Sequence, residues 1–432
     1  MTTITVEQKQ KANELRKEGK IKEALSIYEA LWKEAEDKFI GAGLLHCLRK
    51  MELFEKAILF ADGLIAKYPD FEWCKNEVIW TYIHGILEKV KDDEPLENIL
   101  EIAQKIMSLN PDGLAAKKVV FKVLKTAKAL NNWKTVDEWV AKISPDTLST
   151  NPMTNSLGRE GWSDQSLWYN YKIRSLIEKG QPNEALILID QISECFPKQK
   201  KFFLRLEGLA YYQLKNLAEA KKVYQKLCSN HKPDWWLLHE YAKVVRDKGQ
   251  REEALKIMYQ AANNHPKLEA MVTLFVDIGN LCKEIGKNEA ARAHLALCKF
   301  VRDEQGWSIP YSIISTIAEV NKLIGNNNEP TSLKEALILC RGEWKKVTGK
   351  NEKLSLQKGR KLRRELTGRI NLGKPDQPFC FIIGKDNESF FCFKSDLPQG
   401  LKDGDEVIFN AIPSFDKKKN KESWKAVDIR KG

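Results

Sequence analysis

The chain has 432 residues, of which 43% are hydrophobic and 30% charged, and its formal net charge is +12 at pH 7. This composition is typical of a folded globular protein and excludes global disorder, and the length exceeds that of one small domain. No stretch resembles a membrane span or a secretory segment, so we expect a cytoplasmic protein without membrane contact. The nine cysteines are scattered among apolar stretches, which favours free thiols over a disulfide framework.

Residues 1 to about 300 repeat a pattern of paired amphipathic helices. In each second helix, three apolar residues stand at positions i, i+4 and i+7, and the first of them is small or aliphatic. This spacing places all three residues on one helix face. The examples are Ala24/Tyr28/Leu31, Ala57/Ala61/Leu64, Ala185/Ile189/Ile192, Ala220/Tyr224/Leu227, Ala254/Met258/Ala261 and Ala291/Leu295/Cys298, with looser versions at Ile99/Ala103/Ile106 and Val136/Val140/Ile143. One helix pair cannot bury such a stripe alone, so we expect the pairs to stack into a solenoid.

This pattern resembles the tetratricopeptide repeat (TPR). The best match is 201–230, where Gly208, Tyr211, Ala220 and Tyr224 occupy the family's small and aromatic positions. The resemblance implies a right-handed α-solenoid whose groove holds a protein or peptide partner. We divide this part of the chain into N-terminal TPR-like repeats (1–143), a loop or insertion rich in Ser, Thr, Asn, Pro and Gly (144–166), C-terminal TPR-like repeats (167–305) and capping helices (306–348).

The positive charge is concentrated near the C-terminus. Residues 345–432 carry 21 basic and 12 acidic side chains, a net charge of +9, whereas residues 1–344 carry +3. We expect a basic helical linker at 349–366, in which Arg360, Arg363 and Arg364 share one helix face. Such a concentration of positive charge has two equally good explanations. It indicates either a polyanionic partner or a charged surface that contacts only solvent.

After the linker the hydrophobic period changes from helical to strand-like. Short segments rich in β-branched and aromatic residues alternate with turns at 367–372, 378–383, 389–393, 405–412 and 423–430. Five strands in so short a stretch predict a small closed barrel at 367–432, because a single sheet would leave long edges open. The expected fold class is therefore mostly α, a TPR-like α-solenoid followed by a small all-β five-stranded barrel.

The C-terminal region resembles a cold-shock domain, a small barrel of the oligonucleotide-binding (OB) fold. The matching stretches are 368–382, 389–393, 401–409 and 425–429. Three positions depart from the family, since Leu372 replaces its usual Trp, Cys380 a Gly and Cys392 a His. Trp424 is a candidate to replace one of the lost rings. The resemblance implies binding of single-stranded RNA or DNA.

Strand alternation selects the residues that would contact nucleic acid. Phe379 and Phe381 share one strand face, and we expect Phe390 to be exposed with them, while the resemblance adds Phe393. Such rings stack on bases. Phe391 and Phe409 are expected in the core. The basic residues expected to contact phosphates are Arg369, Lys374, Lys385 and Lys394 in the barrel and Arg360, Arg363 and Arg364 in the linker.

Motifs for catalysis are absent from the sequence. It contains no P-loop, GxGxxG, GxSxG, HExxH or CxxC motif, and its six histidines are isolated from one another. We therefore expect no catalytic, cofactor or metal site. The leading hypothesis is a non-catalytic adaptor that binds a protein through the solenoid and single-stranded RNA or DNA through the barrel. The layout resembles repeat-plus-barrel proteins of bacterial nucleic-acid-processing conflict systems, which implies a defence role. The alternatives are a pure protein-interaction scaffold and a peptide-sensing TPR regulator.

Overall fold

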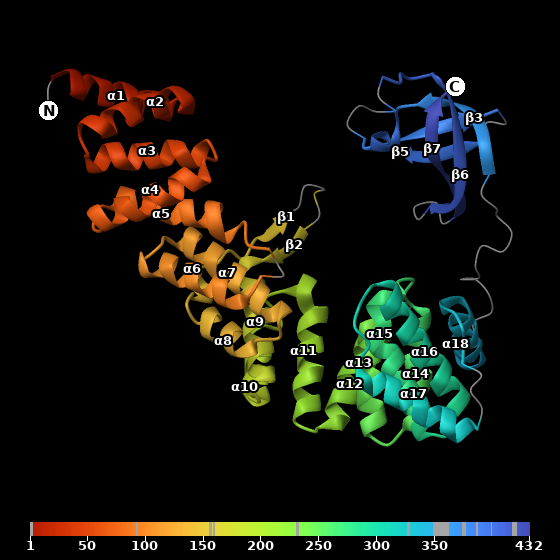
Figure 1. The fold of residues 1–432 in the computed structure, drawn as a ribbon. Helices are drawn as coiled ribbons and strands as arrows, with labels where there is room; N and C mark the ends of the chain where they lie inside the picture. The colour runs from red at the N-terminus through yellow and green to blue at the C-terminus, as the bar shows by residue number, and fades with distance from the viewer. Residues whose placement is uncertain are drawn as a thin grey trace. The chain divides into compact units, whose positions relative to one another are not determined.

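The computed structural model describes residues 3–91, 94–154, 158, 160–229, 233–325, 329–348, 363–373, 377–385, 388–398, 400–416 and 421–432. The chain divides into two compact units, Met1–Thr348 and Gly349–Gly432. Figure 1 shows that the first unit is a succession of helix pairs and the second a small barrel. Among the described helices, none is both long and apolar enough to cross a membrane.

In the first unit, the α-helices from α1 to α17 pack against their neighbours in chain order (Figure 1). The helices of this unit are α1 (Thr3–Lys17), α2 (Ile21–Glu34), α3 (Lys38–Lys50), α4 (Phe54–Lys67), α5 (Glu72–Tyr82), α6 (Leu96–Ser108), α7 (Gly113–Ala129), α8 (Trp133–Val140), α9 (Asp164–Glu178), α10 (Pro182–Ile192), α11 (Lys200–Gln213), α12 (Leu217–Cys228), α13 (Trp235–Asp247), α14 (Arg251–Asn263), α15 (Val272–Glu284), α16 (Asn288–Glu304), α17 (Tyr311–Ile324) and α18 (Leu333–Thr348). A π-helical turn, Ile83–Leu87, extends α5, and short 3₁₀ turns lie at Pro145–Thr147, Pro197–Gln199 and Leu268–Met271.

The predicted stripes lie where the helices meet. Ala24, Tyr28 and Leu31 are buried on α2, and the corresponding triplets on α4, α10, α12, α14 and α16 are buried as well. Each stripe places a small residue where its helix crosses a neighbour and larger apolar residues beside it. The prediction of a mostly helical, TPR-like solenoid is thereby confirmed.

Glycines allow close helix approaches in this unit. A Cβ atom at Gly208 of α11 would lie 2.9 Å from the Tyr224 ring of α12, and one at Gly279 of α15 would lie 2.6 Å from Leu295 of α16. These distances are shorter than carbon atoms tolerate, so a side chain here would push the two helices of the pair apart. The glycine that matched the TPR pattern is therefore explained by the fully buried tyrosine that packs on it.

A series of ion pairs links the first helix of one pair to the first helix of the next. Arg49 of α3 pairs with Glu77 of α5 at 2.6 Å, and Arg205 of α11 pairs with Glu240 of α13 at 2.5 Å. Burial by itself would raise the pKa of the Glu77 carboxyl, but contacts with His46 and Arg49 outweigh burial and lower it. The arrangement recurs in Lys243–Asp277 and Lys283–Glu319. Cations of these helices are thus neutralised within the solenoid, in keeping with its small net charge.

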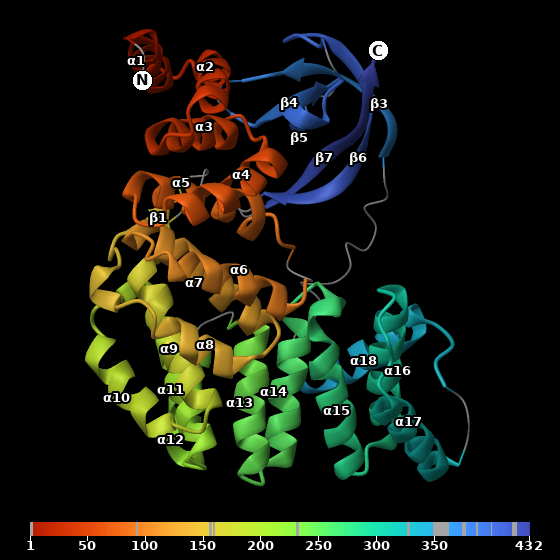
Figure 2. The same ribbon diagram turned by 60° about the vertical axis from the view of Figure 1, so that its left-hand side comes forward.

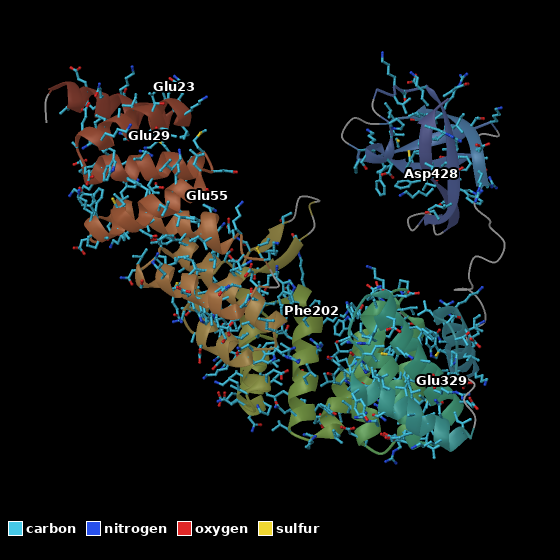
Figure 3. All side chains as sticks on the ribbon, in the orientation of Figure 1. Glu23, Glu29, Glu55, Phe202, Glu329 and Asp428 are labelled. Carbon is cyan, nitrogen blue, oxygen red and sulfur yellow. The ribbon has the colours of Figure 1, made fainter. Side chains whose placement is uncertain are left out.

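The segment predicted as a loop or insertion, 144–166, contains a two-stranded hairpin of β1 (Pro152–Thr154) and β2 (Glu160–Ser163). The hairpin packs on the start of α11, where the Trp162 ring lies 5.1 Å from Phe202 and Gln199 Nε2 donates to the Gly161 carbonyl at 3.2 Å. Phe202, labelled in Figure 3, also stacks on Trp236 of α13 with ring centroids 6.4 Å apart. The two described strands of the insertion therefore pack on the repeat surface.

The last helix of the unit packs on helices that lie earlier in the chain. Residues spaced by four give α18 one apolar face, and this face contacts α14 and α16 (Figure 2). Trp344 is buried there, and its Nε1 donates to Nε2 of His294 on α16 at 2.8 Å. His294 Nδ1 in turn donates to the Ala290 carbonyl at 2.7 Å. His294 is therefore neutral, because its Nε2 accepts the hydrogen bond from Trp344, and the contact holds α18 against α16.

We expect this contact to be weakened by acid. Burial lowers the pKa of His294 from 6.5 to about 4, against smaller opposing effects of the Ala290 carbonyl and Glu343. The unfolded chain therefore binds a proton below pH 6.5 that the folded chain binds only near pH 4, so stability is lost as the pH falls through this window. Between about pH 7 and 5 the loss in unfolding free energy should be about 2 kcal/mol.

Hydrogen exchange of the α16 and α18 amides at the two pH values measures this loss. In His294→Gln the part of the pH dependence that comes from residue 294 should disappear, because glutamine does not titrate. Identical pH dependence in the variant and the wild type would contradict the assignment.

The second unit is a closed barrel of β3 (Arg363–Asn371), β4 (Phe379–Gly384), β5 (Ser389–Phe393), β6 (Glu406–Asp416) and β7 (Lys421–Lys431). The strand order is β3-β4-β5-β7-β6, with β5 and β7 parallel and every other pair antiparallel. This mixed five-stranded barrel agrees with the predicted OB-type architecture. Its core comprises Ile370, Cys380, Ile382, Phe390, Cys392, Val407, Phe409, Ala411, Trp424 and Ala426.

The start of the barrel corrects one prediction. Arg363 and Arg364 were expected on the last turn of a basic helix, but they begin β3, which pairs with β6 through Arg363 and Ala411. Tertiary pairing with β6 therefore decides the conformation here, against a sequence whose charged residues suit a helix. Arg363 and Arg364 therefore do not lie on a helix face, and Arg360 lies outside the described residues.

Candidate nucleic-acid interface

One row of side chains crosses all five strands on the outer face of the barrel. The strand register joins Asn371 of β3 to Phe381 of β4, Phe381 to Phe391 of β5, Phe391 to Lys425 of β7, and Lys425 to Ile412 of β6. Directly opposed residues on one face have Cβ atoms about 4.5–5.5 Å apart, so these side chains are neighbours. Residues far apart in the sequence thus form one surface.

Four phenylalanines lie together on this face, and we call Phe379, Phe381, Phe391 and Phe393 the phenylalanine platform. They form two adjacent register pairs between β4 and β5. Their neighbouring ring centroids lie 5.1 to 6.1 Å apart. Phe381 and Phe393 are 38% and 41% exposed, and the other two are half-buried. Lys425 Nζ lies 5.0 Å from the centroid of the Phe393 ring. The platform is an open aromatic surface with a cation at its edge, the composition that single-stranded nucleic acids stack on.

The prediction that Phe390 is exposed with these rings is wrong. Phe390 is 2% exposed and packs edge-to-face on Phe409 in the core, with ring centroids 4.9 Å apart. Phe391, which was expected in the core, takes the outer position, because it lies opposite Phe381 in the register. Alternation required the two neighbours to point in opposite directions, but it did not decide which of them points outward. Trp424, the candidate replacement ring, is buried.

The predicted basic residues surround the barrel unevenly. Arg369, Lys385, Arg363 and Arg364 are exposed, and Lys394 is half-buried beside the end of β5. Lys374 and Arg360 lie outside the described residues. Several cations of the barrel have acidic partners, namely Arg369–Glu406 at 3.2 Å, Arg363–Glu388 at 2.5 Å and Lys425–Asp396 at 3.5 Å. Exposed pairs of this kind are worth only about 0–1 kcal/mol, so these cations remain able to exchange their partner for a phosphate.

Two cysteines lie beneath the platform. Cys380 and Cys392 face each other across β4 and β5, both are buried, and their Sγ atoms are 3.1 Å apart. Burial, and next the neighbouring Cys380, raise the pKa of the Cys392 thiol. This thiol therefore stays protonated at neutral pH and acts as a small apolar group in the core.

A second feature, which we call the barrel-end pocket, lies at the end of β4 that is away from Phe379. The pocket has a volume of about 260 Å³. Its charged and polar lining comprises Arg363, Glu365, Thr367, Lys385 and Glu388. Arg363 and Lys385 were predicted to contact phosphates, but the pocket was not predicted. Its lining residues come together only when β3 meets the end of β4 and the start of β5.

The described residues contain no group of three or more His, Cys, Asp or Glu side chains placed to hold a metal ion. A family model described as a domain of unknown function (DUF7017) matches residues 206–322, which run from α11 into α17 and so lie within the solenoid. No curated protein matches the chain.

Among solved structures, the chain is similar to the crystal structure of a tetratricopeptide repeat protein from Parabacteroides merdae. The two share 12% sequence identity over 62% of this chain and 96% of the other, with a TM-score of 0.30. The TPR-like architecture is established by the buried stripes and by the packing of the helix pairs described above. Fold and site together define the class of protein, a TPR-like solenoid joined to a five-stranded barrel with an aromatic outer face.

Substitutions should separate the core ring from the platform ring. Phe390→Ala should lower the free energy of unfolding of the barrel by about 3–5 kcal/mol, because it leaves a cavity in the core. Phe381→Ala should lower it by about 1 kcal/mol or less, because this ring is partly solvated. Hydrogen exchange of barrel amides in the full-length protein measures both. Equal losses in the two variants would show that the inner and outer faces are assigned incorrectly.

Proposed function

We propose that the chain is a non-catalytic adaptor whose barrel binds single-stranded RNA or DNA and whose solenoid binds a protein partner. The phenylalanine platform is the observation that carries the proposal. Its four rings come from two adjacent strands, and two of them are more than a third exposed. Contiguous apolar patches on a protein surface commonly mark sites where a ligand or partner binds.

Base stacking fits the platform for energetic reasons. Each base stacked on an aromatic side chain gains about 1–3 kcal/mol, and every base can stack. Arg369 is held by an exposed ion pair with Glu406, and Lys425 by a long ion pair with Asp396 and its contact with the Phe393 ring, so phosphates can compete for both cations. Base stacking is therefore expected to supply most of the binding free energy. The contacts between cations and phosphates should supply a smaller part, which decreases as the salt concentration rises.

The solenoid supports the second half of the proposal. Stacked helix pairs present extended surfaces, which repeat proteins use to bind other proteins. The ion pairs between successive first helices neutralise many of its charges, so we expect recognition through shape and through half-buried aromatic residues such as Phe202 and Trp236. A role in bacterial nucleic-acid processing or defence would extend this proposal and is supported by the sequence resemblance alone.

The test is binding of a fluorescent single-stranded oligonucleotide to the full-length protein, measured by anisotropy. The double variant Phe381→Ala/Phe393→Ala should weaken binding by at least about tenfold, because it removes the two most exposed stacking rings. Tyr311→Ala is the matched control, since this ring is 81% exposed on α17 of the solenoid. It should bind as the wild type does.

Two results would contradict the proposal in different ways. Wild-type affinity in the double variant would indicate that the platform contacts a protein, as in a pure interaction scaffold. Absence of oligonucleotide binding by the wild type would show that the barrel has another ligand.

A further inference from the structure

We propose that the barrel-end pocket holds one unstacked base of the strand that stacks on the platform, and that it selects guanine. This inference rests on the proposed function and adds sequence preference to it. Stacking on the platform does not discriminate between bases, so selectivity requires a second site with hydrogen-bonding groups.

The rim of the pocket belongs to the same barrel face as the platform. Along β4 the outward positions are Phe379, Phe381 and Ile383, and Lys385 continues them at the end of the strand. Arg369 of β3 lies opposite Ile383, so Thr367 continues the outer face of β3 toward Lys385. At about 3.3 Å per residue, Phe381 and Lys385 are about 13 Å apart along the strand, a distance that an extended oligonucleotide can cross.

The size of the pocket fits a base. Its volume of about 260 Å³ exceeds the roughly 150 Å³ of an engineered protein cavity that binds benzene, which leaves room for a two-ring heterocycle. Leu366 lines the pocket, and the edge of the buried Phe390 ring lies at its base. Gly384 keeps this edge open, because a Cβ atom there would lie 3.0 Å from Cε2 of Phe390.

The charges of the pocket favour a neutral ligand with both donors and acceptors. Arg363 and Lys385 carry donors, and Glu365 and Glu388 carry acceptors. Arg363 pairs with Glu388 at 2.5 Å and Glu365 with Arg430 at 2.9 Å, and a bound base would replace these weak, exposed ion pairs with its own hydrogen bonds. A phosphate would meet two carboxylates, so an anion fits poorly. Guanine presents its O6 acceptor beside its N1–H and N2–H donors. O6 can accept from an ammonium or guanidinium group, while N1–H and N2–H can both donate to one neighbouring carboxylate. The other bases do not offer two adjacent donors of this kind.

The backbone of Glu365 is fixed in an unusual conformation at the pocket, and its exposed carboxylate accepts from Arg430 Nη2 at 2.9 Å. Glu365 has φ +53° and lies at an irregularity in the β3–β6 pairing between Arg363 and Leu366. Its backbone N–H donates to Asn410 Oδ1 at 3.0 Å, and Asn410 Nδ2 donates to Asp428 at 2.9 Å. A left-handed conformation in a residue other than glycine is maintained only when its surroundings impose it, and such residues concentrate at binding sites.

The experiment compares oligonucleotides that differ at one position. Short fluorescent oligo(dT) strands that carry a single central dT, dG, dC or dA are titrated with the full-length protein. The wild type should bind the dG strand about tenfold more tightly than the all-dT strand, the discrimination that one bidentate contact provides. Glu365→Gln should abolish this preference and keep the all-dT affinity within about twofold. Lys385→Met should abolish the preference as well, and because Lys385 is also predicted to contact phosphates, it should weaken the binding of all four strands to a similar extent. Lys431→Met, a loss of the same charge at the exposed end of β7, should retain the preference.

The outcomes separate this inference from the proposed function. Equal binding of all four strands by the wild type, a preference for another base, or a dG preference that persists in both pocket variants would overturn the pocket assignment while leaving the platform intact. Two results together support the proposed function and the pocket assignment. Phe381→Ala/Phe393→Ala should weaken the binding of every strand by at least about tenfold, and the dG preference should occur only in proteins with an intact pocket. Absence of binding by the wild type to every strand overturns the proposed function itself.

Discussion

The pairing register between β4 and β5 is the constraint on which the surface of the barrel depends. Cys380 lies opposite Cys392 inside the barrel, and Phe379 and Phe381 therefore lie opposite Phe393 and Phe391 outside it. A shift of one residue would exchange the two faces and place large rings where only small thiols fit. The size of the core groups thus determines which aromatic residues remain available to a ligand.

The solenoid depends on a different kind of contact. Its helices approach closely at glycines such as Gly208 and Gly279, and tyrosine or leucine side chains fill the remaining space. Ion pairs such as Arg205–Glu240 connect successive repeats and neutralise charged side chains on the first helix of each pair. The two units consequently present different surfaces, one extended and locally neutralised, the other small and aromatic with basic neighbours.

Sequence periodicity was sufficient for the helical repeats and for the existence of five strands. It failed at three particular places. Arg363 lies in a strand because β6 pairs with it, Phe390 and Phe391 exchange their expected faces because of the partner strand, and residues 144–166 contain a hairpin that packs on α11. Each failure concerns a segment whose conformation is set by a contact with residues distant in the chain.

The amino-acid sequence by itself determined the architecture and most of the aromatic site. Stripes spaced by four and three residues require stacked helix pairs, and alternating phenylalanines require a ring-bearing sheet face, because each spacing places its residues on one face of the element. The tertiary structure alone decided that Phe391 completes the platform and that Trp344 reaches back to His294. It also assembled the barrel-end pocket from separate strands. These features depend on which elements meet, and local spacing carries no information about partners that far away.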